Sequence, residues 1–244
     1  MLGSLLESLQ IDVAFLQETH FGSCYEARSF EQRISVKGYF SFGSTRARGA
    51  AIVFRNTFRG QVARHCFDYE GRVVSVDVSV NGKDIRLVSV YAPTDHQERN
   101  EFFRGLDPYL MGKRDILVGG DFNCVLDDVR DRVGGTPRHQ PWKAKELRRL
   151  LRATNLTDAW NQLHGVTPGF TFCFRERQVR LDRFYVTQTV SPILVDCAVV
   201  QVGTSANFFS DHRALVLETR DQQGFGLQPT PWRLNLSLLE EERG

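Results

Sequence analysis

Short apolar runs that end in polar residues recur along the chain. One such run, residues 116–118, leads directly into Gly119-Gly120-Asp121-Phe122-Asn123. This pattern is typical of a buried strand that delivers polar groups at its carboxyl end. Residues two apart on an extended backbone point the same way, so Asp121 and Asn123 could address one substrate atom while Phe122 packs inward. The alternative is a strand followed by an ordinary Asx-type turn.

The same reading, applied to the whole chain, predicts alternating helices and strands. Helices are expected at residues 1–10, 99–110 and 143–154, and strands at residues 11–16, 49–54, 72–80, 85–91, 116–118, 170–174, 179–186 and 214–217. Asn81-Gly82 between two strands predicts a tight hairpin. Residues 127–141, rich in Gly, Pro, Arg and Asp, predict an exposed loop, and residues 175–178 a charged turn. We expect one α/β domain over residues 1–219 and a linker-like tail over 220–244.

Composition and charge narrow the class of protein without naming a partner. The chain has 244 residues, of which 41% are hydrophobic and 25% charged, as in ordinary globular proteins. The net charge of +2 is too small to indicate a ligand, but residues 128–152 hold eight basic and three acidic side chains. That stretch predicts either a polyanion-facing surface or a solvated helix face.

The five cysteines and the hydropathy indicate the cellular compartment of the protein. The cysteines are odd in number and have no C-x-x-C spacing, which argues against a disulfide framework and structural zinc. No stretch approaches the roughly 18 apolar residues of a membrane span, and the first ten residues lack the basic start of a signal peptide. We expect a soluble, intracellular protein that makes no contact with membranes.

Candidate chemistry lies at the strand ends. Polar residues stand at or near five of these ends, namely Glu18, Tyr91, Asp121 with Asn123, Asp182, and Asp211 with His212. Taken singly, Glu18 is more simply a solvated acid and Tyr91 a half-buried aromatic. Together, carboxylates at strand ends suit a hard divalent cation such as Mg²⁺, and a His–Asp pair supplies an oriented imidazole. With arginines nearby, this set favours hydrolysis of a phosphate ester.

Five short motifs, in this order, carry a family resemblance. They are Gln17-Glu18-Thr19, Tyr91-Ala92-Pro93, Gly120-Asp121-Phe122-Asn123, Leu181-Asp182-Arg183-Phe184-Tyr185 and Ser210-Asp211-His212. The set resembles that of the endonuclease/exonuclease/phosphatase superfamily, and five ordered motifs over about two hundred residues are far more specific than any one. Within it, the chain looks most like the apurinic-endonuclease-like domain of non-LTR (LINE-type) retrotransposon polyproteins. The tail from Trp232 resembles the segment that leads toward their reverse transcriptase.

The resemblance implies a fold and a role for each residue. The fold would be a DNase I-like, four-layer αββα sandwich of two mixed sheets flanked by helices. Glu18 would bind Mg²⁺, with Mn²⁺ as a substitute, and Asp211 would bind the same ion or support His212. Asp121, with Asn123 beside it, would orient or deprotonate the attacking water. Tyr91 and His212 would contact the scissile phosphate, and Asp182 would orient His212. The reaction would be cleavage of one DNA strand to leave a 3′-hydroxyl, by a monomeric domain acting in the nucleus.

Substrate contacts are expected from four arginines, Arg46, Arg130, Arg175 and Arg177. Among these, the turn at residues 175–178 is the candidate for entering a DNA groove, and an exposed hairpin without such a role is the alternative.

One departure from the superfamily concerns its first strand, which carries an asparagine and precedes the first helix. Residues 1–17 hold no such strand and no asparagine. We therefore expect a chain that lacks this strand, with an unpaired edge in one sheet and weak or absent nicking. This leaves two alternatives to a DNA endonuclease, namely a phosphatase of the same superfamily and an inactive remnant that only binds nucleic acid.

Overall fold

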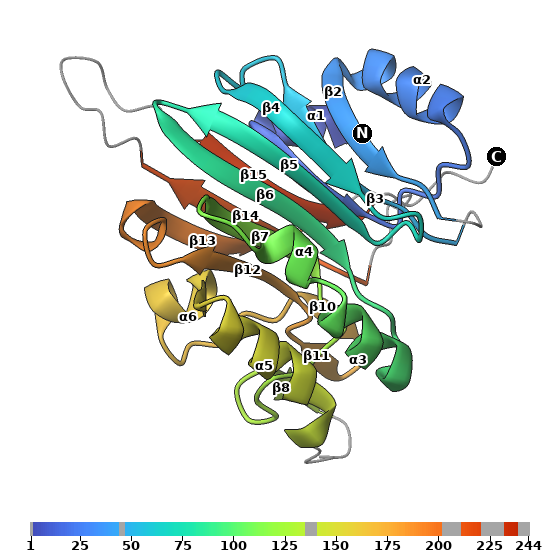
Figure 1. Cartoon of the computed structure of the whole chain (residues 1–244). Helices are drawn as coiled ribbons and strands as arrows, with labels where there is room; N and C mark the ends of the chain where they lie inside the picture. The colour runs from blue at the N-terminus through green and yellow to red at the C-terminus, as the bar shows by residue number, and fades with distance from the viewer. Residues whose placement is uncertain (1, 44–46, 135–140, 202–210, 221–231, 239–244) are drawn as a thin grey trace.

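The computed structural model describes residues 2–43, 47–134, 141–201, 211–220 and 232–238. Its centre is a pair of six-stranded sheets packed face to face, with helices on the two outer surfaces (Figure 1). Both sheets mix parallel and antiparallel pairs, so the expected four-layer αββα sandwich is confirmed. No helix in the described ranges is long and apolar enough to cross a membrane.

The first sheet has the strand order β13-β14-β15-β1-β3-β2 and the second the order β4-β5-β6-β7-β12-β9. The strands of the first sheet are β13 (Leu194–Val200), β14 (Ala214–Thr219), β15 (Trp232–Leu238), β1 (Val13–Gln17), β3 (Ala50–Arg55) and β2 (Val36–Ser41). Those of the second are β4 (Gln61–Phe67), β5 (Val73–Val80), β6 (Lys83–Tyr91), β7 (Asp115–Asp121), β12 (Asp182–Thr187) and β9 (Leu156–Asp158). A third, small sheet joins β10 (Phe172–Phe174), β11 (Arg177–Val179) and β8 (Arg132–Val133).

Central strands read as continuous apolar runs because both of their faces are buried. In β1, Val13 and Phe15 face the second sheet, whereas Ala14 and Leu16 face the helices α1 (Leu2–Ser8) and α2 (Cys24–Ile34). The other outer layer packs on β5, β6 and β7. It contains the helices α3 (His96–Arg104), α4 (Asp107–Leu110) and α5 (Lys145–Ala153). The short α6 (Ala159–His164) packs at the edge of the core between the sheets.

The hairpin predicted at Asn81-Gly82 is confirmed. Val80 pairs with Lys83 across the turn, and both turn residues have positive φ, 51° and 75°. These angles suit a two-residue turn of the kind that Asn-Gly favours, because its twist matches that of the strands. The hairpin therefore sets the register of β6, which ends at Tyr91.

Three predicted elements need correction. The helix expected over residues 99–110 is two helices, α3 and α4, because Gly105 ends α3 and Pro108 cannot donate a hydrogen bond within a continuous helix. The charged turn expected at 175–178 contains only residues 175 and 176, since Arg177 already pairs with Phe174 in the hairpin of β10 and β11.

The tail is the largest correction. Trp232–Leu238 forms β15, which pairs with β1 in parallel and with β14 antiparallel, so it lies inside the first sheet. In Figure 1 it runs between these strands near the middle of the sandwich. The expected linker-like tail therefore contributes a central strand. β1 accordingly has a partner on each side, β15 and β3.

A proline in β15 is expected to destabilise the whole domain. Leu236 pairs with Phe15 on one side and Leu215 on the other. Leu236→Pro removes a backbone donor from the middle of the sheet, which should cost about 3 kcal/mol or more. Leu236→Val keeps the donor and is the matched control. Urea unfolding followed by circular dichroism measures both, and equal stabilities would contradict the placement of β15.

Candidate active site

The register of three neighbouring strands brings the central polar residues together. β6 and β7 run in parallel with Tyr91 opposite Asp121, and β12 runs antiparallel to β7 with Asp182 opposite Asp121. Asp121 and Asp182 are buried and Tyr91 is nearly so. Three strand ends that lie far apart in the sequence thus meet at one rim of the sandwich.

Gly120 permits this close approach of β6 and β7. Its φ is +146°, and a Cβ atom there would lie 1.9 Å from the carbonyl oxygen of Val90. No other residue can adopt this backbone without moving β6 away, because the obstructing atom belongs to the backbone. Gly120, the residue directly before Asp121, is therefore a geometric requirement of the site.

Asp121 and Asn123 do lie together, but the predicted extended backbone is wrong. Asn123 has φ 44°, and its backbone N–H donates to Asp121 Oδ1 at 2.8 Å, which closes an Asx-type turn. The Asn123 amide then donates to Asp121 Oδ2 and to the Ala92 carbonyl, both at 2.9 Å. Phe122 packs inward against Tyr185, as predicted. The Asx-type turn, which was the alternative to an extended backbone, therefore places the side chains of Asp121 and Asn123 together.

His212 is oriented by Asp182. Its Nδ1 lies 2.8 Å from Asp182 Oδ2, and Phe172 packs edge-on against the ring. Phe172 and His212 also form an isolated β-bridge, which holds residues 211–213 against the start of β10. The pairing predicted between Asp182 and His212 is therefore present.

The charges of this centre are strongly coupled. Burial works to lower the pKa of His212, but Asp182, Asp121 and Asp211 outweigh it and raise that pKa to about 10. Burial and the negative charge of Asp182 raise the pKa of Asp121 to about 7, against the opposing effect of the His212 charge. The imidazole is thus protonated at neutral pH, and Asp121 gains or loses a proton there.

Tyr91 links the two sheets at this rim. Its hydroxyl donates to Glu18 Oε1, and burial together with this hydrogen bond raises the pKa of Tyr91. Glu18 follows β1 directly and has a left-handed φ of 51°. The neighbouring Gln17 donates from Nε2 to Ser89 Oγ at 3.2 Å, across the interface of the sheets. Glu18 therefore contacts Tyr91, at the end of β6 in the second sheet.

The predicted metal ligands are fewer than a complete site needs. Glu18 is half-buried and Asp211 is exposed. Among the residues that the structure describes, no group of three His, Cys, Asp or Glu side chains is placed to hold a metal ion. Such a sparse oxygen donor set would suit Mg²⁺, which keeps several waters, and would not suit structural zinc. All five cysteines are free, which also fits the absence of a disulfide framework.

The predicted substrate arginines are exposed at the rim, except for one that lies outside the described residues. Arg175 and Arg177 belong to the β10–β11 hairpin, which starts at Phe172 beside His212. Arg130 forms a 3.5 Å ion pair with Asp127 on the loop before β8. Arg46 is in residues 44–46, which are not described. The β10–β11 hairpin therefore begins beside His212 and carries Arg175 and Arg177.

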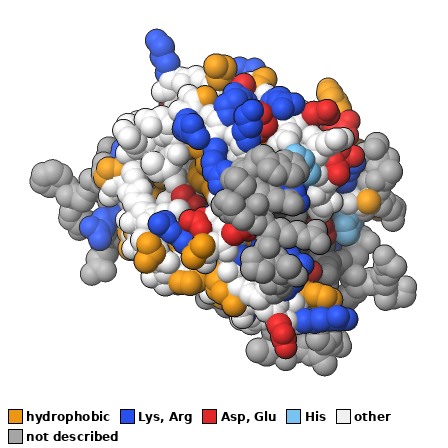
Figure 2. Space-filling view, turned by 90° about the horizontal axis from the view of Figure 1, so that it is seen from below, with side chains coloured by type: hydrophobic (Ala, Val, Ile, Leu, Met, Phe, Trp, Pro, Cys, Tyr) orange, Lys and Arg blue, Asp and Glu red, His pale blue; other side chains and the backbone are white. Residues whose placement is uncertain are grey.

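Part of the basic excess in residues 128–152 is neutralised by acids. Arg149 pairs with Glu146 at 3.1 Å, and Asp107 lies 3.8 Å away. Figure 2 shows basic and acidic side chains interspersed on the face seen from below. For α5, the ion pairs favour the solvated helix face over the polyanion-facing surface.

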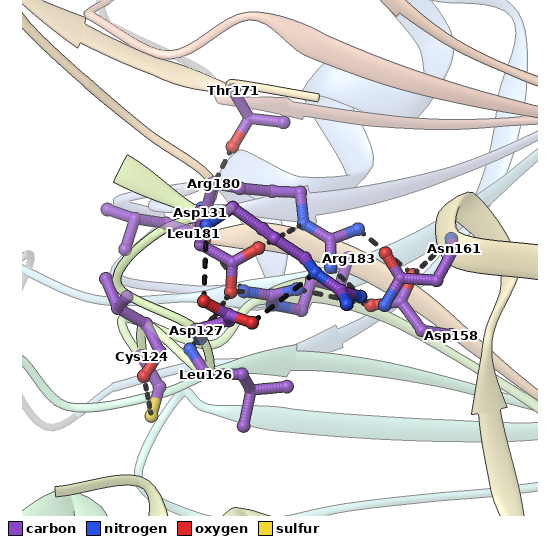
Figure 3. Close-up of polar contacts among 12 residues, drawn as sticks. Cys124, Leu126, Asp127, Asp131, Asp158, Asn161, Thr171, Arg180, Leu181 and Arg183 are labelled. Atoms are coloured by element: carbon purple, nitrogen blue, oxygen red, sulfur yellow. Dashed lines mark hydrogen bonds and ion pairs between the residues drawn. The ribbon is translucent and has the colours of Figure 1, made fainter. Parts of the chain in front are cut away.

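Two buried arginines beside Asp182 were not among the predicted site residues. Arg180 donates to Asp131 at 3.0 Å and to Asp158 at 2.6 Å, and Arg183 donates to the same two carboxylates at 2.6 and 3.2 Å (Figure 3). Arg180 and Arg183 are 4% and 0% exposed, so the four charges form a closed network. The sequence already indicated this network, because Arg180 and Arg183 lie three residues apart in a predicted apolar strand. Arginines that are buried there need carboxylate partners.

This network corrects the prediction of an exposed loop over residues 127–141 at one position, Asp131. Residues 129, 130, 133 and 134 are exposed, and residues 135–140 lie outside the described part of the chain. Asp131 is buried and also accepts from the backbone N–H groups of Leu126 and Asp127, at 3.1 and 2.9 Å. Thr171 acts on the other side, since its hydroxyl accepts from the N–H groups of Leu181 and Asp182 (Figure 3). The loop before β8 and the motif around Asp182 are therefore held as one unit.

Asp131→Ala is expected to destabilise the domain by about 3–5 kcal/mol, because it leaves two buried guanidinium groups without half of their compensating charge. Asp84→Ala is the control. Asp84 is 59% exposed in a surface pair with Arg114, and its loss should cost no more than about 1 kcal/mol. Chemical unfolding of both variants measures the difference, and a similar small loss in each would show that the network does not hold the loop.

Comparisons with known proteins agree with this geometry. Residues 1–212 match the Endonuclease/Exonuclease/phosphatase family. A curated relative, the transposon TX1 uncharacterized 149 kDa protein of Xenopus laevis, is 29% identical over 98% of this chain, which spans 18% of that protein's length.

Solved structures show the same fold at low identity. An AP endonuclease from Archaeoglobus fulgidus superposes with a TM-score of 0.68 at 20% identity, over 88% of this chain and 91% of its own. A 3′ phosphatase from Neisseria bound to a product DNA hairpin has a TM-score of 0.71 at 20% identity, over 89% of this chain and 92% of its own.

Proposed function

The chain belongs to the endonuclease/exonuclease/phosphatase family, and from this premise we propose that it is a Mg²⁺-dependent endonuclease that cuts one DNA strand and leaves a 3′-hydroxyl. The observation that carries the proposal is the buried centre of Asp121, Asp182 and His212. It places a carboxyl group that titrates near neutral pH beside a protonated imidazole. A base and a cation in one site are what hydrolysis of a phosphate diester requires.

The roles follow from the contacts. Asp121, held by Asn123, accepts a proton from the attacking water, whose oxygen forms a bond to phosphorus. The bond between phosphorus and the 3′ oxygen breaks, and that oxygen takes a proton from solvent water to become the 3′-hydroxyl. His212, charged and oriented by Asp182, stabilises the negative charge that develops on the phosphoryl oxygens. Tyr91 contacts the same phosphate through the hydroxyl that it now donates to Glu18.

Glu18 and Asp211 are the residues that would hold the cation. Tyr91 contacts only Oε1 of Glu18, which leaves the other oxygen of this carboxylate for a ligand. When bound, Mg²⁺ would polarise the phosphoryl oxygen, with waters completing its coordination. Mn²⁺ accepts the same oxygen donors and should substitute for it.

DNA is the proposed substrate for two reasons. The curated relative is a transposon protein, and one solved structure of this fold is bound to a DNA hairpin. In addition, the β10–β11 hairpin presents Arg175 and Arg177 at the rim beside His212. Arg175 lies over the ring of Phe174, with 5.2 Å between the guanidinium carbon and the ring centroid, so a compact tip can enter a groove. An enzyme of this retroelement type would act in the nucleus, as a monomeric domain.

Nicking of supercoiled plasmid tests the proposal. We expect conversion to the open-circular form with Mg²⁺, its loss on adding EDTA, and its loss in His212→Ala. Arg59→Gln, an exposed arginine beyond the opposite end of β3, is the control and should nick normally. Release of inorganic phosphate without nicking would instead identify a phosphatase. DNA binding without any turnover would identify an inactive remnant.

A further inference from the structure

One buried arginine that the catalytic scheme does not use lies on α3. Arg99 is 6% exposed, and its Nη1 donates to the carbonyl oxygens of Pro93 and Thr94, at 3.2 and 2.7 Å. Pro93 and Thr94 follow Tyr91 and Ala92 at the end of β6. The guanidinium of Arg99 therefore holds the turn that leads from Tyr91 into the helix.

The same face of α3 contacts the segment after β7. Phe103, four residues after Arg99, stacks on the ring of Phe122, with 6.4 Å between the ring centroids. Burial raises the pKa of the Cys124 thiol, and the positive charge of Arg99 and a hydrogen bond with its guanidinium oppose this rise. Arg99 therefore touches both chain segments that meet at the centre, the one after β6 and the one after β7.

The Asn123 amide depends on the turn that Arg99 holds. Asn123 Nδ2 donates to the Ala92 carbonyl and to Asp121 Oδ2, both at 2.9 Å. In the other direction, the Ala92 N–H donates to the Asp121 carbonyl at 2.8 Å. The three consecutive carbonyl groups of residues 92–94 thus accept from two side chains, the first from Asn123 and the other two from Arg99. A shift of this turn would move the amide that holds the Asp121 carboxylate.

Packing alone does not call for an arginine at this position. The interface between α3 and the end of β7 is apolar, with Phe103 and Phe122 both buried, so an aliphatic side chain would fit there without burying a charge. The turn itself offers carbonyl acceptors, and Pro93 has no N–H to pair with them. A planar guanidinium can bind two such carbonyls at once, which an aliphatic side chain cannot.

We propose that Arg99 is a positioning residue for the hydrolytic reaction. It fixes the turn at residues 92–94, and through the Asn123 amide it keeps Asp121 aimed at the attacking water. This inference rests on the proposed function, in which Asp121 accepts the proton of that water. Because Arg99 is buried and bonds to the protein backbone, its loss should slow the reaction without weakening the binding of DNA.

Arg99→Met tests this role, because it keeps the apolar stem of the side chain and removes the donors. We expect single-turnover plasmid nicking to slow by about 10- to 100-fold. Binding to a short duplex in EDTA, measured by fluorescence anisotropy, should not change. Arg99→Lys keeps the charge and a single donor group, so its nicking rate should lie between those of the unmodified protein and Arg99→Met. Arg104→Met, the same change at a 57% exposed side chain at the end of α3, is the matched control and should nick normally.

A double-mutant cycle with Asn123 separates positioning from a general loosening of the fold. Asn123→Ala removes the amide through which Arg99 is proposed to act. Arg99→Met should therefore cause no further slowing in the Asn123→Ala background, whereas two independent effects would multiply. The cycle is repeated with Arg99→Lys, so that a folding defect in Arg99→Met does not decide the result. Urea unfolding of each variant shows that the rates compare folded proteins.

The proposed function and the positioning role fail in different ways. If the unmodified protein does not nick DNA, the proposed function fails and the positioning role fails with it. If the protein nicks DNA and Arg99→Met nicks as fast as Arg104→Met, the positioning role is refuted and the function stands. The role is equally refuted if the losses of Arg99→Met and Asn123→Ala multiply in the double variant, or if weaker DNA binding accounts for the slower nicking of Arg99→Met.

Discussion

Asp121→Asn is expected to lower the nicking rate by about 10²- to 10⁴-fold, the range that a positioned general base contributes. The amide keeps the shape of the carboxylate and an oxygen that can accept from the Asn123 N–H, but it cannot take a proton from water. The change in stability should be small, because removal of the repulsion between Asp121 and Asp182 is offset by the new amide nitrogen, which faces the Asn123 amide that donates to Asp121 Oδ2. Activity and stability are thus predicted to separate.

Single-turnover plasmid nicking, with urea unfolding on the same preparations, measures that separation. Asp84→Asn is the control, since it makes the same chemical change at an exposed position near the start of β6. Equal nicking rates for the unmodified protein and Asp121→Asn would exclude Asp121 as the base. A large loss of stability in Asp121→Asn would show that its role is structural.

The pH dependence of nicking is expected to change when Asp182 becomes asparagine. In the unmodified protein the rate should rise with pH through about 7, as Asp121 loses its proton, and fall through about 10, as His212 loses its own. Asp182 raises both pKa values. Asp182→Asn should therefore move both limbs of the profile to lower pH. It should also reduce the maximum rate by about 10- to 100-fold, because His212 loses an orienting partner.

The same linkage predicts a stability effect. His212 has a folded pKa above its usual 6.5, so its contribution to stability is complete below about pH 6.5 and is lost as the pH rises through about 10. In Asp182→Asn, the loss of stability with rising pH should be smaller. Rate profiles and unfolding midpoints between pH 5.5 and 10.5 measure both effects. If both limbs of the profile of nicking rate against pH stay at the same pH in Asp182→Asn, then Asp182 does not set the pKa values of Asp121 and His212.

Most of what the sequence predicted correctly is local. Asn81-Gly82 sets its hairpin through the φ preferences of two residues, and the apolar run into Asp121 marks a strand end that exists. The proposed catalytic residues could be named because each motif places one side chain at a known point of a strand, and their roles stay predictions. The order of the five motifs then linked strand ends that lie far apart in the sequence. No local pattern of apolar and polar residues could have linked them.

What sequence reasoning missed depends on contacts between distant segments. Nothing in residues 220–244 shows that Trp232–Leu238 pairs with β1, because a strand's partner is set by the whole sheet and not by its own pattern. Asp131 lies in a stretch of Gly, Pro and charges, and its burial follows only from Arg180 and Arg183, about fifty residues later in the chain.

The chemistry of the cut end tests the central claim most directly. Plasmid nicked by this protein with Mg²⁺ would be given to a DNA polymerase and labelled nucleotides, without prior phosphatase treatment. We predict immediate extension from the nick, because the bond to the 3′ oxygen is the one proposed to break. Nicks that the polymerase extends only after a 3′ phosphate is removed would contradict the proposed reaction.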